Sequence, residues 1–204
     1  MINTHNKLIN YLIERERLKS KSVINAFKEA DRKWFVLPEY RDQCYEDKPL
    51  TIGSGQTISQ PTTVAIMMEA LGVQRGDHVL DIGSGSGWTT VLLGYQVGPN
   101  GSVIGIERQD SLIELGTNNI AKFSQLPIHI NSATKSIGIP EKRFDKILVS
   151  AAGTCVPEDL LNQLNVQGCC VIPIQNDIYI ITKDEKNNVS TTYLRGFSFV
   201  PLIL

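Results

Sequence analysis

The segment VLDIGSGSGW, from Val79 to Trp88, has the composition of a strand that leads into a glycine-rich turn and then a helix. Glycines permit a tight turn and let backbone N–H groups come close to a ligand. Their spacing at Gly83, Gly85 and Gly87 is G-x-G-x-G, which differs from the G-x-G-x-x-G of dinucleotide-binding turns. Taken alone, the three glycines favour an ordinary strand-to-helix turn.

An acidic residue ends the next predicted strand. Glu107 closes the apolar run SVIGIE and follows Gly87 by 20 residues. A carboxylate at this place suits hydrogen bonds from both hydroxyl groups of a ribose. A solvated charge at a strand end is the alternative for Glu107 taken alone. Strand, glycines, helix, second strand and terminal acid in this order favour a nucleoside site.

S-adenosylmethionine fits this site better than NAD for a physical reason. It has no pyrophosphate, so it does not need the tight phosphate cradle that dinucleotides require. It does need room for its methionine moiety beside the glycine turn.

Strand and helix patterns alternate along the chain around this motif. Helical periodicity covers residues 5–18, 22–30, 62–71, 87–96, 110–122 and 157–165. Short apolar runs typical of strands cover residues 78–82, 102–107, 127–130, 144–150, 169–174, 178–182 and 190–200, whereas residues 31–60 are rich in turn formers.

This alternation predicts an α/β fold with a doubly wound, mostly parallel seven-stranded sheet of the Rossmann-like type. The last two strands follow each other directly, which predicts an antiparallel hairpin at the C-terminal end. We expect one domain over residues 1–204. Residues 1–60 would form a helical segment on the substrate side, and residues 61–204 the cofactor-binding core.

The composition argues against several classes of protein. The 20 Lys and Arg residues and 21 Asp and Glu residues give a net charge of −1, without the basic surplus typical of nucleic-acid-binding proteins. The three histidines are scattered and the four cysteines form no CxxC pair, so we expect no metal site and buried, reduced thiols. Charges interrupt the N-terminal apolar pattern, and no apolar stretch suits a bilayer span. We expect a soluble, cytoplasmic monomer that binds neither membranes nor nucleic acid.

Two motifs together resemble the protein-L-isoaspartate O-methyltransferases. They are VLDIGSGSGW, which is general among S-adenosylmethionine-dependent methyltransferases of class I, and GQTISQP within residues 48–65, which is specific to this family. An Arg-x-x-Phe-Val element at Arg32, Phe35 and Val36 is similar as well. So are the later segments FDKILVSAAGTCVPEDLLNQL and FSFVPL, and the resemblance therefore covers nearly the whole chain.

The resemblance implies a carboxyl O-methyltransferase that uses S-adenosyl-L-methionine. Its substrate would be the free α-carboxylate of L-isoaspartyl residues in damaged proteins or peptides, and methylation would begin their repair through a succinimide. Ser59 would lie at the reacting carboxylate as the catalytic residue. The cofactor would be bound by Thr57, Ile58, Gln60, Gly83, Ser84, Gly85, Gly87, Glu107, Ala133 and Thr134.

The chemistry of the residues agrees with this role for Ser59. A carboxylate at neutral pH is already a nucleophile, so the reaction needs placement rather than a strong general base. A serine hydroxyl can donate a hydrogen bond to one carboxylate oxygen and orient the other. The alternative role for Ser59 is to cap the helix that begins near Pro61.

The chain departs from the family pattern at three places. Ala133 stands where the family has the aspartate of a Gly-Asp-Gly element beside the adenine, and Pro173-Ile174-Gln175 replaces Pro-Val-Gly. The sequence also ends at Leu204, soon after FVPL, and these departures predict a more open or differently shaped site. Two alternatives follow: a divergent member that methylates another carboxylate, such as an aspartate in a peptide natural product, or a non-catalytic module that binds S-adenosylmethionine.

Overall fold

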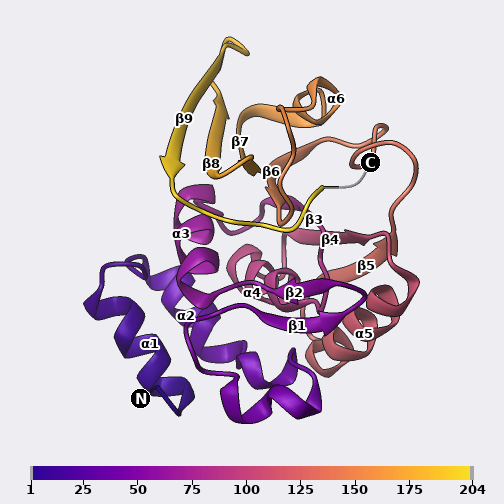
Figure 1. Cartoon of the computed structure of the whole chain (residues 1–204). Coiled ribbons are helices and arrows are strands. Elements are labelled where there is room, and N and C mark those ends of the chain that lie inside the picture. Colours follow the sequence, from indigo (N-terminus) through magenta and orange to yellow (C-terminus); the bar gives the residue numbers. More distant parts are fainter. Residues whose placement is uncertain (1, 203–204) are drawn as a thin grey trace.

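A seven-stranded sheet forms the centre of the computed structural model, which describes residues 2–202 (Figure 1). The sheet order is β5-β4-β3-β6-β7-β8-β9; the first five of these strands run parallel, and β8 and β9 are antiparallel to their neighbours. This confirms the predicted sheet and its C-terminal hairpin. The strands are β3 (His78–Ile82), β4 (Ser102–Glu107), β5 (Ile128–Ser132), β6 (Phe144–Val149), β7 (Leu164–Ile174), β8 (Asp177–Lys183) and β9 (Val189–Arg195).

Helices cover the two faces of the sheet unequally. On one face α3 contacts β6 and β7, α4 contacts β3 and β4, and α5 contacts β4 and β5, while α1 and α2 pack farther out. On the other face, the apolar side chains are covered, within residues 2–202, only by the single turn α6 and irregular segments. The helices are α1 (His5–Glu14), α2 (Lys21–Glu29), α3 (Pro61–Leu71), α4 (Trp88–Val97), α5 (Asp110–Ile120) and α6 (Glu158–Leu161).

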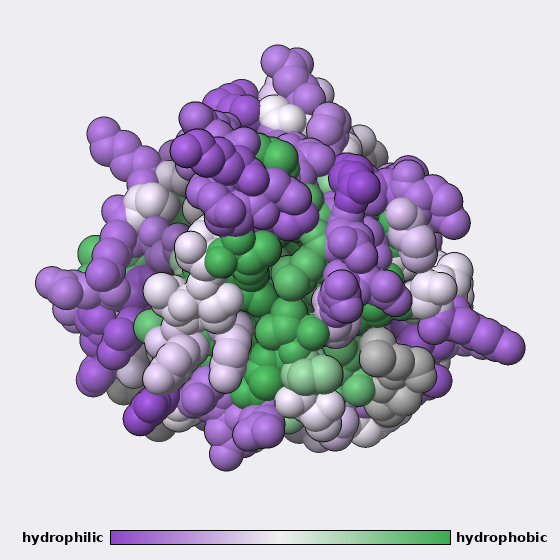
Figure 2. All heavy atoms as spheres, turned by 90° about the horizontal axis from the view of Figure 1, so that it is seen from above, coloured by the Kyte–Doolittle hydropathy of each residue, from purple (hydrophilic) through white to green (hydrophobic). Residues whose placement is uncertain are grey.

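The thin cover leaves apolar side chains partly exposed on the second face. Ile137, Ile139, Val156 and Leu161 pack against its core cluster and are only half-buried. Figure 2, which looks down on the molecule from above, shows hydrophobic side chains at the centre of that view inside a hydrophilic border.

Two predicted helices are shorter in the structure than the sequence indicated. The helix predicted for residues 157–165 is limited to α6, because β7 already begins at Leu164 and pairs there with Phe144 of β6. The helix predicted for residues 5–18 ends at Glu14, and Glu16 has a positive φ of 55° that a helix cannot accommodate.

Residues 31–60, whose sequence is rich in turn formers, contain two short helices and a hairpin that this composition does not predict. Two 3₁₀ helices, η1 (Arg32–Trp34) and η2 (Pro38–Gln43), precede the antiparallel hairpin of β1 (Leu50–Gly53) and β2 (Gln56–Ile58). All three residues from 53 to 55 have positive φ, which reverses the chain between the two strands.

The cysteines match the prediction only in part. Cys44, Cys169 and Cys170 are buried free thiols, but Cys155 is exposed, so the prediction of four buried thiols was wrong there. Cys155 lies in the loop between β6 and α6, outside the apolar strands that bury the adjacent pair.

Among residues 2–202, no three His, Cys, Asp or Glu side chains lie together as metal ligands would.

Within the same residues, every helix is too short or too polar to cross a lipid bilayer.

Glycines allow α4 and α5 to approach each other closely behind the glycine turn. A Cβ atom on Gly87 would lie 2.7 Å from Cγ2 of Ile120 and 3.2 Å from the carbonyl oxygen of Gly116. A Cβ atom on Gly116 would lie 2.7 Å from the carbonyl oxygen of Gly85. The backbone contact therefore fixes the turn against α5 and leaves no space for side chains at these positions.

We predict that Gly87→Ala destabilises the protein more than Gly72→Ala. Both glycines have a positive φ (85° and 61°), but an added Cβ atom on Gly72 meets nothing within 4 Å. Gly72→Ala should lower the free energy of unfolding by about 1–2 kcal/mol through backbone strain alone. Overpacking should add about 1–3 kcal/mol for Gly87→Ala. Urea unfolding measures both, and equal losses would contradict the packing argument.

Candidate active site

A pocket lies at the carboxyl ends of β3 and β4, where open α/β sheets bind their ligands. The glycine turn forms its floor, and the end of β4, the β1–β2 hairpin, α5 and the C-terminal segment form its walls. Its lining includes Thr57, Ile58, Ser59, Gly83, Ser84, Gly85, Trp88, Glu107, Leu112, Ala133, Ser150 and Val200–Leu202.

Parallel pairing of β3 with β4 brings the glycine turn beside Glu107. Ile82 is paired with Ile106, and the amides of Gly83 and Ser84 donate to the Ile106 carbonyl at 2.9 and 3.2 Å. Gly83 and Gly85 then adopt positive φ values of 76° and 50°, which bend the chain back over the ends of the strands.

The Glu107 carboxylate is fixed by backbone amides. It is 7% exposed; Oε1 accepts from the amides of Arg108 (2.8 Å) and Gln109 (3.1 Å), and Oε2 accepts from Gly85 (3.0 Å). Each carboxylate oxygen has two acceptor positions, so Oε2 can accept one further hydrogen bond. Glu107 is thus a fixed hydrogen-bond acceptor in the pocket wall. A solvated charge at a strand end would instead be exposed and free to change its orientation.

Asp81 lies beneath the turn and was not predicted as a site residue. Its side chain is fully buried, and its Oδ2 accepts from the hydroxyls of Thr89 (2.8 Å) and Thr90 (2.7 Å). Burial raises the pKa of Asp81 to about 6 and the charge of Glu107 adds to this, while the two threonine hydrogen bonds oppose it. An acid inside the apolar run VLDI was the available sequence signal.

Two buried polar atoms near the turn have no hydrogen-bond partner within residues 2–202. They are Oδ1 of Asp81 and Oγ of Ser84, and Ser84 also lines the pocket. Buried polar groups are rarely left unpaired in folded proteins. Asp81 does not line the pocket, so the Ser84 hydroxyl is the one of the two that a polar ligand seated on this turn could pair with.

Ser59 lies between β2 and α3 and is half-buried. It does not cap α3: the N-cap position is Gln60, whose side chain makes no capping hydrogen bond. The Asp47 carboxylate instead accepts from the amide (2.8 Å) and the hydroxyl (2.7 Å) of Thr62 in the first turn. The alternative role of Ser59 as a helix cap is therefore wrong.

A second, wider groove meets the pocket at Ser59. The two spaces share Thr57, Ser59, Ser150 and Val200, and the groove continues along α3 and the segment after β9. Charged side chains occur on its walls, together with the aromatic residues of the C-terminal segment: Glu16, Arg17, Lys19, Glu69, Arg195, Phe197 and Phe199. A molecule in the groove can thus reach a ligand in the pocket at Ser59, which lines both spaces.

The structure brings most of the predicted site residues to the pocket. The eight that line it are Thr57, Ile58, Ser59, Gly83, Ser84, Gly85, Glu107 and Ala133. Gln60 lines the groove instead, Gly87 supports the turn from behind, and Thr134 lies outside the pocket lining with its hydroxyl donating to the Ser136 carbonyl at 3.3 Å. Ser150 also lies at the junction, a position that its sequence context did not reveal.

The C-terminal segment covers one side of the pocket. The amide of Ala152 donates to the carbonyl of Val200 and the amide of Leu202 donates to the carbonyl of Ala152, both at 2.8 Å. These bonds hold residues 200–202 in the pocket wall.

The strand order, the glycine turn after β3 and the acidic end of β4 together define a class I S-adenosylmethionine-dependent methyltransferase.

Comparison with known proteins assigns the chain to one family within that class. Residues 3–204 match the family model for protein-L-isoaspartate(D-aspartate) O-methyltransferase. Relatives named protein-L-isoaspartate O-methyltransferase include those of Ignicoccus hospitalis, 40% identical over 97% of this chain and 96% of the relative, and of Petrotoga mobilis, 37% identical over 96% and 93%. A similar solved structure is a Plasmodium falciparum chain assigned to this family, in complex with S-adenosyl-L-homocysteine; the TM-score is 0.87, with 28% identity over 98% of this chain and 99% of that one. The protein belongs to the protein-L-isoaspartate O-methyltransferase family.

We predict that the protein becomes less stable as the pH rises from about 4 to about 6, and that Asp81 causes this loss. Its pKa is about 6 in the folded protein and 3.8 in the unfolded reference, so in this window the folded state holds a proton that the unfolded state has lost. The free energy of unfolding should therefore decrease by about 3 kcal/mol as the pH rises through the window, and stay level above it.

Asp81→Asn should remove this contribution. Urea unfolding at several pH values, for the parent and the variant, measures it as the difference between the two curves. Curves that run parallel from pH 4 to pH 6 would show that Asp81 does not carry the effect.

Proposed function

We propose that this protein transfers a methyl group from S-adenosyl-L-methionine to the free α-carboxylate of L-isoaspartyl residues in proteins and peptides. The observation that carries the proposal is the position of Ser59, where the pocket at the glycine turn and Glu107 meets the wider groove along α3. Membership of the family and the S-adenosyl-L-homocysteine in the Plasmodium relative support it.

The pocket residues fit the parts of the cofactor. Glu107 would accept from the ribose hydroxyls, and the turn at Gly83, Ser84 and Gly85 would hold the methionine moiety with its amides and the unpaired Ser84 hydroxyl. Thr57, Ile58 and Ala133 would complete the wall, while Gln60, Gly87 and Thr134 would act only around it. When bound, the cofactor supplies an activated methyl group on its sulfonium.

The residues at the junction would position the substrate rather than activate it. The α-carboxylate is ionised at neutral pH, so one of its oxygens would form the bond to the methyl carbon while the carbon–sulfur bond would break and leave its electron pair on sulfur. Ser59 would donate its hydroxyl proton to a hydrogen bond with the other oxygen and hold the carboxylate in line. The methyl ester is a better electrophile than the carboxylate. The amide nitrogen of the following residue would attack its carbonyl carbon and methanol would leave with the amide proton, which closes a succinimide whose hydrolysis returns some normal aspartate.

The partners would be damaged proteins that present a mobile isoaspartyl segment to the groove. We further propose that the protein acts on them in the cytoplasm and as a monomer. All four of its cysteines are free thiols, which agrees with a reducing compartment.

Glu107→Gln should weaken binding of S-adenosylmethionine by about tenfold or more. The amide has no charge and one acceptor oxygen, and a hydrogen bond to a charged group contributes about 1.5–3 kcal/mol. Glu114→Gln, on the exposed side of α5, is the matched control and should bind normally. Calorimetric titration measures both, and unchanged affinity in a folded Glu107→Gln would rule out the ribose contact.

Ser59→Ala should lower the single-turnover rate of methyl transfer about ten- to a hundredfold, because one hydrogen bond to a charged oxygen is lost. Its affinity for S-adenosylmethionine and its melting temperature should stay unchanged, since Asp47 and not Ser59 caps α3. Labelled cofactor and one isoaspartyl peptide provide the assay, and the aspartyl peptide of identical sequence is the control substrate. A parent protein that binds the cofactor but methylates no isoaspartyl peptide would falsify the proposed substrate and favour another carboxylate.

A further inference from the structure

Arg32 is a buried cation that contacts carbonyl groups instead of carboxylates. Its side chain is 1% exposed, and no Asp or Glu among residues 2–202 lies within ion-pair distance of it. A buried cation without a paired carboxylate is costly, and an apolar side chain of similar volume would often serve stability better. The contacts that Arg32 makes therefore call for an explanation beyond core packing.

The guanidinium group donates to two separate stretches of backbone. Nη1 reaches the carbonyl oxygens of Cys44 (2.9 Å) and Glu46 (3.3 Å), and Nη2 reaches that of Lys48 (2.9 Å). These three bonds fix the loop over residues 44–48.

The same Nη2 atom also reaches the residues that present the Ser59 hydroxyl. It lies 3.1 Å from the carbonyl oxygen of Ser59 and 3.4 Å from that of Ile58. The planar fork of an arginine can serve several acceptors at once, which a lysine ammonium on its flexible stem cannot reproduce. Arg32 thus joins the loop at 44–48 to the backbone of Ser59.

Asp47 in this loop holds the other side of Ser59. Its carboxylate accepts from the amide and hydroxyl of Thr62, three residues beyond Ser59, at 2.8 and 2.7 Å. The chain from residue 58 to residue 62 is therefore bound at both ends by side chains from one segment. We call the Arg32 and Asp47 side chains, with the backbone of residues 58–62, the Arg32–Asp47 clamp.

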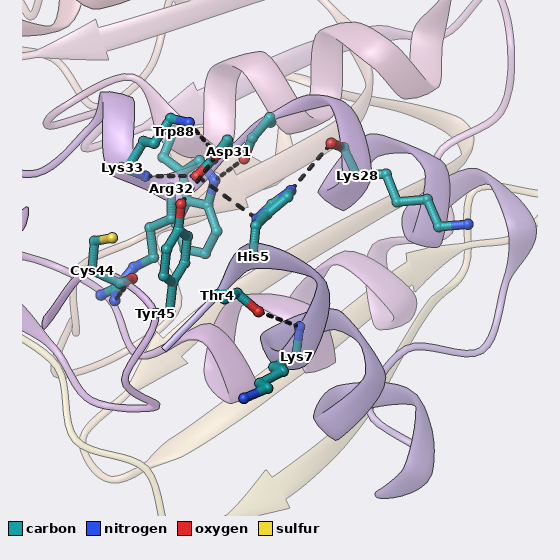
Figure 3. Close-up of polar contacts among 11 residues, drawn as sticks. Thr4, His5, Lys7, Lys28, Asp31, Arg32, Lys33, Cys44, Tyr45 and Trp88 are labelled. Carbon is teal, nitrogen blue, oxygen red and sulfur yellow. Dashed lines mark hydrogen bonds and ion pairs between the residues drawn. The ribbon is translucent and has the colours of Figure 1, made fainter. Parts of the chain in front are cut away.

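The surroundings hold Arg32 itself in place. Asp31 caps η1 by accepting from the Lys33 amide at 3.1 Å, and Figure 3 shows its carboxylate between His5, Lys33 and Tyr45. The guanidinium carbon lies 5.4 Å from the ring centre of Trp88, which opens α4 and lines the pocket. Through Trp88, the clamp is therefore in contact with the wall of the cofactor pocket.

We propose that Arg32 and Asp47 are positioning residues for methyl transfer. They hold residues 58–62 so that the Ser59 hydroxyl faces the junction between the pocket and the groove. This inference rests on the proposed function for its kinetic consequence, but the ordering of residues 58–62 does not. Neither side chain lines the pocket or the groove, so both act through Ser59.

The kinetic test compares Arg32→Lys and Asp47→Ala with the control Asp145→Ala. Asp145 also joins two segments, by accepting from the His78 amide and the Asn165 side chain (both 2.8 Å), but at the opposite end of β3. The two clamp variants should lose about tenfold or more in kcat on an isoaspartyl peptide, because small misplacements cost up to about a hundredfold. Their dissociation constants for S-adenosylmethionine should change by less than about threefold, and Asp145→Ala should keep its kcat.

Amide hydrogen exchange tests the clamp without relying on the substrate. With saturating cofactor, peptides that cover residues 58–62 should exchange faster in both clamp variants than in the parent and in Asp145→Ala, while those from β3 and β4 stay protected. A parent protein inactive on isoaspartyl peptides would overturn only the proposed substrate. Unchanged exchange at residues 58–62, or an unchanged kcat in variants of an active parent, would overturn the clamp. If Arg32→Lys does not fold, the same two measurements on Asp47→Ala test the proposal.

Discussion

The in-register parallel pairing of β3 with β4 is the interaction on which the site depends. It places Gly83 and Glu107 at the same edge of the sheet and lets the Gly85 amide donate to the Glu107 carboxylate. The glycine contact between the turn and α5 then fixes the turn from behind. A loop alone could not hold an acceptor this firmly, because the hydrogen bonds that orient Glu107 come from backbone already committed to the sheet and the next helix.

The sequence predicted those parts whose residues determine their own conformation. β3 and β4 have the predicted bounds, since each is a short apolar run between turn residues. The helix predicted over residues 157–165 was wrong for most of its length, because pairing of β7 with β6 outweighs a local helical pattern. The role of Arg32 could not be predicted, because its side chain binds five backbone carbonyl groups. Every residue has such a group, so the partners leave no signal in the sequence.

The two spaces at the site are built by different parts of the chain. The sheet and its glycine turn provide the floor of the pocket, whereas the hairpin, α3 and the C-terminal segment provide the groove. Residues from the N-terminal 60 positions and from the sheet share one core cluster, so the groove is packed onto the pocket. Ser59 belongs to both spaces, and its place depends on how firmly residues 31–60 are held to the core.

This arrangement matches what the reaction requires. An ionised carboxylate and a sulfonium need no base to react, so the protein can accelerate the step mainly by reducing the freedom of the two groups. Rigid placement of a neutral hydroxyl then matters more than its acidity. A buried guanidinium that binds carbonyl groups contributes little net stability, because its desolvation is costly. It does fix backbone positions that apolar packing alone would leave less well defined. The energetic cost of burying Arg32 is thus explained by the geometry it imposes on Ser59.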